Sequence, residues 1–108
     1  MPDVQSVESV FAEMESNFRG DKAIGLDATY QFNITGDDGG VWNARVADGE
    51  VTLEKGEVDS PTVTITVASS DWVSIVSGKL NPQMAFMTGK LKVQGDLGLA
   101  TKLQSLFF

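Results

Sequence analysis

The chain has 108 residues, of which 42% are hydrophobic and 21% charged, and its formal net charge is -7 at pH 7. This length suits one compact domain over residues 1–108, and the acidic balance argues against a nucleic-acid partner, because phosphates are bound by clustered Lys and Arg. The sequence contains no Cys and no His, which excludes disulfides, the usual zinc sites and catalysis built on an imidazole or a thiolate.

The first predicted element is an amphipathic helix that follows Asp3, a residue type that caps helix N-termini. Its apolar residues recur at helical spacing and form one stripe. These residues are Val7, Val10, Phe11, Met14 and Phe18. The glutamates between them are expected to face solvent, and Gly20 is expected to end the helix.

Four stretches then alternate apolar and polar residues with the period of two that is typical of half-buried strands. Their apolar positions are Tyr30, Phe32 and Ile34; Trp42, Ala44 and Val46; Val51 and Leu53; and Val63, Ile65 and Val67. Turns are predicted at residues 37–40 and at Asp48-Gly49. Because each strand has one apolar and one polar face, a mostly antiparallel sheet with helices on one face is expected, which is an α+β fold. The opposite, polar face is expected to be wet.

The remaining residues predict three helices and a fifth strand. Ser69 or Ser70 is expected to cap a helix at 70–77, and Asn81-Pro82 to open a helix at 82–88. Leu91 and Val93 mark the strand. Asp96 is expected to cap the last helix, at 97–106, whose stripe is Leu99, Leu103 and Leu106.

Helix 82–88 is apolar nearly all round, because Met84, Ala85, Phe86 and Met87 follow one another. Two interpretations stay open: a buried plug of the core, or a deformable wall of a ligand cavity, to which the flexible Met side chain is suited. Trp42 and Trp72 fit either core packing or a position beside an apolar ligand.

Polar and charged residues near these helices also leave alternatives open. An inward-facing Gln83 or Gln104 could bind a hydroxyl or carbonyl group of a mainly apolar ligand. Four of the eight basic residues lie in the last thirty: Lys79, Lys90, Lys92 and Lys102. They suit either a solvated sheet edge or a small basic patch that meets a membrane. The tail 106–108 is expected to fold over the core, cover a cavity mouth or form a dimer contact.

The run from Gly78 to Gln104, GKLNPQMAFMTGKLKVQGDLGLATKLQ, resembles the type-two sterol-binding domain of the sterol carrier protein family. Residues 25–36 are similar to the first strand of that domain, and Trp42 and residues 48–51 to its second and third strands. The resemblance covers nearly the whole chain. It implies a five-stranded sheet with helices on one face enclosing a hydrophobic tunnel, and non-catalytic binding of fatty acids, fatty acyl-CoA, phospholipids or sterols.

The leading hypothesis is a lipid-binding and transfer protein, not an enzyme, whose ligand lies between the sheet and helices 70–77, 82–88 and 97–106. Eight lining residues and one polar contact are expected: Phe32, Trp42, Trp72, Ile75, Met84, Met87, Leu99 and Leu103, with Gln104. No catalytic residue, metal or cofactor is expected.

The expected partners are a hydrophobic small molecule, a membrane in transient contact, and at most a second copy in a weak homodimer. A cytoplasmic location is expected, because no apolar run approaches the roughly 18 residues of a membrane span and the N-terminus does not read as a secretion signal. The alternative hypothesis is an accessory or dimerisation module for a separately encoded lipid-metabolising enzyme.

Overall fold

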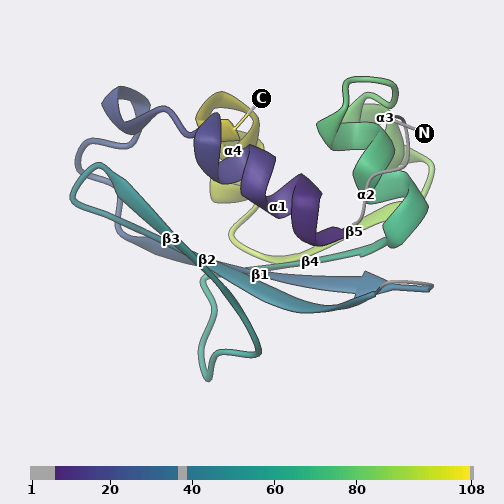
Figure 1. Ribbon diagram of the computed structural model, residues 1–108, viewed down its shortest axis with the longest axis horizontal. Coiled ribbons are helices and arrows are strands. Elements are labelled where there is room, and N and C mark those ends of the chain that lie inside the picture. Colours follow the sequence, from purple (N-terminus) through teal and green to yellow (C-terminus); the bar gives the residue numbers. More distant parts are fainter. Residues whose placement is uncertain (1–6, 37–38, 108) are drawn as a thin grey trace.

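The structure is a computed structural model that describes residues 7–36 and 39–107, and for Gln104 the backbone alone. Five strands form a twisted sheet, and all four α-helices lie on one face of it (Figure 1). The helices are α1 (Val7–Ser16), α2 (Ser69–Val76), α3 (Pro82–Met87) and α4 (Leu97–Phe107), with a short 3-10 helix η1 (Gly20–Lys22). The strands are β1 (Ala28–Thr35), β2 (Gly40–Ala47), β3 (Glu50–Lys55), β4 (Val63–Ala68) and β5 (Leu91–Gly95). The predicted α+β class, the five strands and the one-sided helices are confirmed.

The strand order is β3-β2-β1-β4-β5. β1 pairs antiparallel with β2, β2 with β3 and β4 with β5, while the central pair β1 and β4 is parallel. The sheet is therefore mostly antiparallel, as predicted. β3 and β5 are its two edges, so the last strand and the helices on either side of it lie far from the β2–β3 hairpin.

Local sequence signals explain most of the element boundaries. Asp48 and Gly49 both have positive φ, 57° and 74°, which is the backbone of a tight hairpin turn. Asn81 and Asp96 accept hydrogen bonds from the first backbone N–H groups of α3 and α4, at 2.8 and 3.1 Å, as the predicted caps should. The predicted cap at Asp3 lies outside the described residues, as do residues 37–38 of the turn predicted at residues 37–40.

The predicted serine cap of α2 was wrong. The helix begins at Ser69, and its N-cap is Ala68, the last residue of β4, which has no side-chain group that could accept a hydrogen bond. The strand passes into the helix without a connecting loop, so neither serine occupies the capping position.

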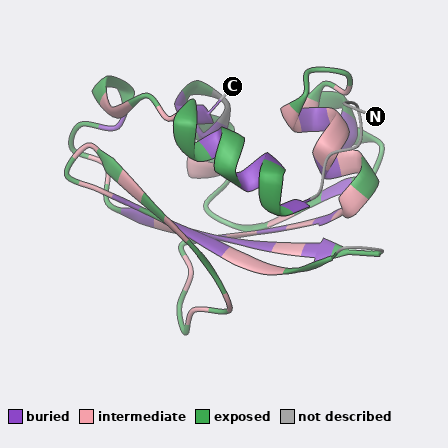
Figure 2. Cartoon of the chain, viewed as in Figure 1, coloured by how far each residue is buried: buried purple, intermediate pink, exposed green. Residues whose placement is uncertain are grey.

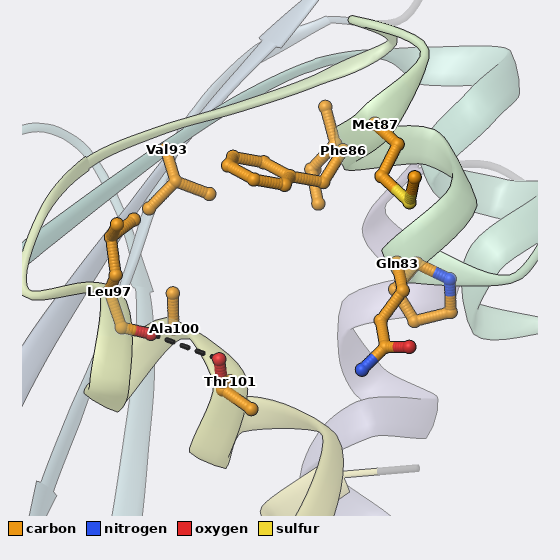
Figure 3. Close-up of a pocket in the computed structure, with 9 residues that line it drawn as sticks. Gln83, Phe86, Met87, Val93, Leu97, Ala100 and Thr101 are labelled. Carbon is orange, nitrogen blue, oxygen red and sulfur yellow. Dashed lines mark hydrogen bonds between the residues drawn. The ribbon is translucent and has the colours of Figure 1, made fainter.

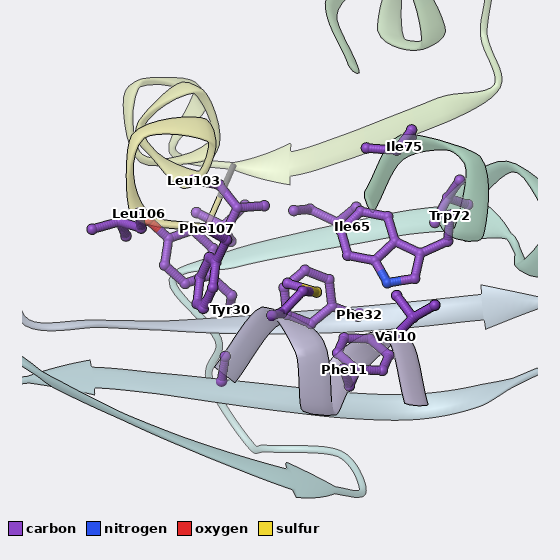
Figure 4. Close-up of a cluster of buried hydrophobic side chains, with 14 of the residues drawn as sticks. Val10, Phe11, Tyr30, Phe32, Ile65, Trp72, Ile75, Leu103, Leu106 and Phe107 are labelled. Carbon is purple, nitrogen blue, oxygen red and sulfur yellow. The ribbon is translucent and has the colours of Figure 1, made fainter. Parts of the chain in front are cut away.

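The core fills the space between the helices and the inner face of the sheet (Figures 2 and 4). Phe11 of α1 lies at its centre, with ring centroids 4.6 Å from Trp42, 5.3 Å from Phe32 and 5.9 Å from Trp72. Phe32 and Trp72 are themselves 5.3 Å apart. This aromatic cluster joins α1 and α2 to the middle of the sheet.

The opposite face of the sheet is less exposed to solvent than predicted, because the loop between β3 and β4 runs beneath it (Figure 1). Gln31 and Asn43 point to this face and are 8% and 7% exposed. The Val58 backbone N–H donates to Gln31 Oε1 at 3.0 Å, and Asn43 Nδ2 donates to the Gly56 carbonyl at 3.1 Å. These two amides hold the loop against the sheet.

The C-terminal residues Leu106 and Phe107 fold back over the core, which is the first of the three arrangements expected for the tail. Both are buried, and the Phe107 ring lies 5.3 Å from that of Phe18. The Arg19 backbone N–H also donates to the Leu106 carbonyl at 2.9 Å. Phe108 lies outside the described residues.

Candidate functional site

A pocket of about 380 Å³ lies between α3, β5 and α4, at the β5 edge of the sheet (Figure 3). Its volume is at the lower end of the range of roughly 300–1,000 Å³ that small-molecule sites occupy. Nine side chains line it: Pro82, Gln83, Phe86, Met87, Leu91, Val93, Leu97, Ala100 and Thr101. Seven of the nine are apolar.

Helical spacing explains why these residues share one pocket. Gln83, Phe86 and Met87 stand at positions i, i+3 and i+4 of α3, and Leu97, Ala100 and Thr101 repeat this spacing on α4. Residues so spaced lie on one face of a helix, and the two faces converge in Figure 3. Leu91 and Val93, two residues apart on β5, point to the same face of the sheet and complete the wall.

Helix α3 is held to the fold at one buried residue. Ala85 is fully buried, and its carbonyl accepts a hydrogen bond from the Lys90 backbone N–H at 2.8 Å. Its neighbours Met84, Phe86 and Met87 are all exposed. They are therefore not a buried plug, and the apolar surface of this helix faces the pocket and the solvent.

Helix α4 has two apolar faces. Leu103 and Leu106 are buried in the core, whereas Leu97 and Ala100 line the pocket. The Tyr30 hydroxyl donates to the Leu99 carbonyl at 2.8 Å and so ties the first turns of α4 to the centre of the sheet. One helix thus closes the core and forms a wall of the pocket.

The polar groups of the pocket lie on its two helices. Gln83 presents an amide from α3, and Thr101 presents a hydroxyl from α4 (Figure 3). Thr101 Oγ1 donates to the Leu97 carbonyl at 3.0 Å, which leaves its lone pairs to accept a hydrogen bond from a ligand. None of the nine lining side chains is titratable, so the arrangement suits holding an apolar molecule that has a small polar end.

The structure brings only part of the predicted site together. Met87 lines the pocket, while Met84 lies on the same helix but outside the lining. Trp42 is half-buried against Phe11, and Leu99 is half-buried at the edge of the core. The Gln104 side chain lies outside the described part of the structure. The remaining predicted residues are buried in the core: Phe32, Trp72, Ile75 and Leu103.

Sequence reasoning missed most of the lining, although a signal for it was present. The repeated i, i+3, i+4 spacing on two consecutive helices, together with the alternation of Leu91 and Val93 between them, marks three surfaces that can meet. Thr101 gave no such signal of its own, because a threonine beside an apolar helix face is common.

Neither a metal site nor a membrane span is found in the described ranges. Within residues 7–36 and 39–107, no group of three or more acidic side chains is placed to hold a metal ion. None of the helices in those ranges is long and apolar enough to cross a membrane.

Tyr30 is expected to make stability fall at high pH. Burial, and then the nearby negative charge of Asp96, raises the pKa of Tyr30 from 10.0 to about 12. The fold therefore favours the neutral phenol, and this stabilisation is complete below pH 10 and lost as the pH rises from 10 to 12. The loss is on the order of 2 kcal/mol.

Because Tyr30 is the only tyrosine of the chain, the ultraviolet absorbance of tyrosinate reports its titration directly. Chemical denaturation between pH 9 and pH 12 gives the matching change in the free energy of unfolding. A Tyr30→Phe variant, the control, should lose less stability over this interval. Titration of the folded protein at pH 10, with equal losses in both proteins, would contradict the prediction.

Comparisons with known proteins agree with this fold. The profile of the SCP-2 sterol transfer family matches residues 9–108. Hydroxysteroid dehydrogenase-like protein 2 of Bos taurus is 37% identical over 102 residues, which are 94% of this chain and 24% of the relative. The chain thus spans about a quarter of the length of this curated relative.

Two solved structures show the same architecture. Palmitated SCP2L2 of Aedes aegypti, determined by solution NMR, is 27% identical with a TM-score of 0.76, over 94% of this chain and 93% of that one. A sec-alkyl sulfatase of Pseudomonas sp., solved as a double mutant, has a TM-score of 0.83 at 21% identity, over 95% of this chain and 16% of that one. The second likeness shows the fold alone.

Proposed function

Because the chain belongs to the SCP-2 sterol transfer family, we propose that it binds and transfers hydrophobic molecules, and that the pocket between α3, β5 and α4 is its binding site. The ligand classes are fatty acids, fatty acyl-CoA, phospholipids or sterols. The observation that carries the proposal is the lining itself, in which seven apolar residues surround a space that reaches the surface and only Gln83 and Thr101 are polar.

Burial of apolar surface supplies the binding energy. Each methylene group that leaves water for the pocket contributes about 0.8 kcal/mol, less the cost of ordering the ligand. A pocket of about 380 Å³ favours a single acyl chain over a bulky ligand, and the palmitated relative from Aedes aegypti supports a fatty acid. Gln83 and Thr101 would bind the polar end of the chain.

The same lining supports a non-catalytic role. A reaction needs a nucleophile, an acid or base, or a metal, and the nine lining side chains offer a threonine hydroxyl and a glutamine amide. The ligand would therefore leave the pocket chemically unchanged. The cytoplasmic location expected from the sequence stays a prediction.

A second role, as an accessory domain, is favoured by the lengths of the relatives. The chain covers 24% of hydroxysteroid dehydrogenase-like protein 2 of Bos taurus, so a domain of this family occurs there within a much longer protein. In that role the pocket would hold a hydrophobic molecule for a partner enzyme. Light scattering tests whether this chain is a monomer, and a monomer that binds lipid on its own would count against a purely structural module.

Met87→Asp tests the proposed site, with Met84→Asp as its matched control. Both methionines are exposed on α3, but only Met87 lines the pocket. A carboxylate at position 87 would lie against a buried acyl chain, and we expect it to weaken binding of a fluorescent fatty acid at least tenfold. Met84→Asp should change the dissociation constant less than twofold.

The same titration tests the sequence-based prediction that Met84 lines the site. Equal weakening by the two variants would favour a site that includes both methionines and would contradict the lining described above. A wild-type protein that takes up no fatty acid and carries no lipid after purification would remove the binding function altogether.

A further inference from the structure

All the sulfur of this chain is in methionine side chains. The sequence has four methionines and no cysteine, and the structure describes three of the four. Met14 is fully buried, whereas Met84 and Met87 on α3 are 56% and 78% exposed. A thioether is oxidised to the sulfoxide when a peroxide reaches its sulfur. Among the described methionines, the two on α3 are therefore the ones open to this reaction.

Met87 is an exposed methionine that also belongs to the pocket. Its side chain lines the cavity together with those of Gln83 and Phe86, and Figure 3 shows all three on the α3 wall. Met84 is not part of the lining. Met87 thus combines two properties, contact with solvent and a position beside the ligand, that neither Met14 nor Met84 combines.

We propose that Met87 is an oxidation site through which peroxides lower the affinity of the pocket for its ligand. The sulfur donates an electron pair to one oxygen of hydrogen peroxide, the O–O bond breaks, and the other oxygen leaves as water with both hydrogens. The thioether is oxidised by two electrons to the sulfoxide, and the peroxide is reduced. Methionine sulfoxide reductases reverse the change. The switch rests on the proposed function, because it regulates the binding of a hydrophobic ligand.

The added oxygen makes the pocket less suited to an apolar chain. Seven of the nine lining side chains are apolar, and oxidation converts Met87 from an apolar side chain into a polar one. A ligand that covers the sulfoxide removes water from its oxygen, and burying a polar group without a hydrogen-bond partner is unfavourable.

Gln83 does not remove this penalty without another loss. It stands one helical turn before Met87 on the same face of α3, and its amide N–H groups are hydrogen-bond donors. A hydrogen bond from this amide to the sulfoxide oxygen would withdraw the amide from the polar end of the ligand. Oxidation therefore weakens binding whether or not Gln83 pairs with the sulfoxide.

Oxidation of Met87 should leave the fold intact. Met87 is the last residue of α3, and the helix is held to the fold by the fully buried Ala85. Met14, in contrast, belongs to the hydrophobic core, where its burial shields it from solvent. The loss of affinity should therefore come from the pocket and not from unfolding.

Peroxide treatment followed by ligand titration tests the proposal. The folded protein is incubated with hydrogen peroxide, the reaction is quenched with free methionine, and peptide mass spectrometry locates each added oxygen. Titration with a fluorescent fatty acid then gives the dissociation constant. We expect the oxidised wild type to bind about tenfold more weakly, which is the effect of about one unsatisfied polar group. Methionine sulfoxide reductases should restore the affinity.

Leucine variants supply the matched pair, because leucine has nearly the volume of methionine and no sulfur. Met87→Leu should bind equally well before and after peroxide treatment, whereas Met84→Leu should lose affinity on treatment as the wild type does. Saturating palmitate should slow the oxidation of Met87 and leave that of Met84 unchanged. Thermal unfolding of the treated and untreated wild type should agree.

Met87→Gln reproduces the change without an oxidant, because its amide oxygen is polar as the sulfoxide oxygen is. It should weaken binding about tenfold, and Met84→Gln should leave binding unchanged.

Three results would overturn the switch: full oxidation of Met87 without a change in affinity, equal losses in Met87→Leu and the wild type, or unfolding that accounts for the lost binding. Each leaves the proposed function standing, because the untreated protein still binds the fatty acid. An untreated protein that takes up no fatty acid would instead overturn the proposed function, and the switch with it.

Discussion

Replacing Ala100 with Phe is expected to abolish most fatty-acid binding while leaving the fold intact. Ala100 lies on the pocket face of α4, where a phenyl ring would occupy space between α3 and β5. Displacing about four ligand methylenes at about 0.8 kcal/mol each would weaken binding roughly a hundredfold. Titration with a fluorescent fatty acid measures the dissociation constant, and thermal unfolding shows that the variant is folded.

A graded series makes this prediction sharper. Ala100→Val, Ala100→Leu and Ala100→Phe should weaken binding in that order, because each fills more of the pocket. Ala12→Phe is the control, since Ala12 is exposed on α1 away from the pocket. An unchanged dissociation constant across a series of folded variants would place the ligand elsewhere.

Replacing Phe11 with Ala is expected to remove about 3–5 kcal/mol from the free energy of unfolding. Phe11 is 1% exposed, and its ring contacts the rings of Trp42, Phe32 and Trp72. The cavity left by the ring would be surrounded by aromatic residues of α2 and the sheet, which cannot all move inward. Because a domain of this size has about 5–15 kcal/mol of stability, the variant should lose a third or more of it unless the wild type lies at the upper end of that range.

Phe86→Ala is the matched control for stability. The same ring is removed there from a side chain that is 47% exposed, and the loss should stay near 1 kcal/mol. Urea denaturation of both variants gives the two free energies. Equal losses would mean that the aromatic cluster around Phe11 is not the centre of the core.

The fold could be predicted from the sequence because its signals are local. Tyr30, Phe32 and Ile34 alternate with polar residues, which predicts a strand with one inward face. Asp48-Gly49 predicts a hairpin turn and has the positive φ angles of one. The parallel pairing of β1 and β4 and the loop held beneath the sheet by Gln31 and Asn43 depend on contacts between distant residues. No local pattern carries that information.

The site was harder to predict, because an apolar residue suits a core as well as a cavity. Phe32 and Trp72 have the size and chemistry of lining residues, but the fold places them at the centre of the aromatic cluster. Phe86 and Met87 are equally apolar, but they lie on the exposed side of α3, and the sequence alone does not say which side of this short helix is exposed. That choice depends on Ala85, whose small side chain lets α3 lie close to the fold and turns the larger residues outward.

The pocket lining and four of the five large exposed apolar side chains among the described residues lie on α3, β5 and α4. Helix α1 and the aromatic cluster, in contrast, pack against the sheet and form the core. Variants of the pocket lining should change ligand affinity, and variants of the aromatic cluster should change stability.

Methionine methyl resonances, followed by NMR while palmitate is titrated into the protein, test the binding site most directly. Met87 lines the pocket, and Met84 lies on the same helix outside the lining. Met14 is buried on the inner face of α1. The pocket between α3, β5 and α4 predicts that the Met87 signal shifts and saturates with the ligand while the Met14 signal stays in place. A shift of Met14 with an unchanged Met87 would contradict this site and place the ligand between the sheet and α1.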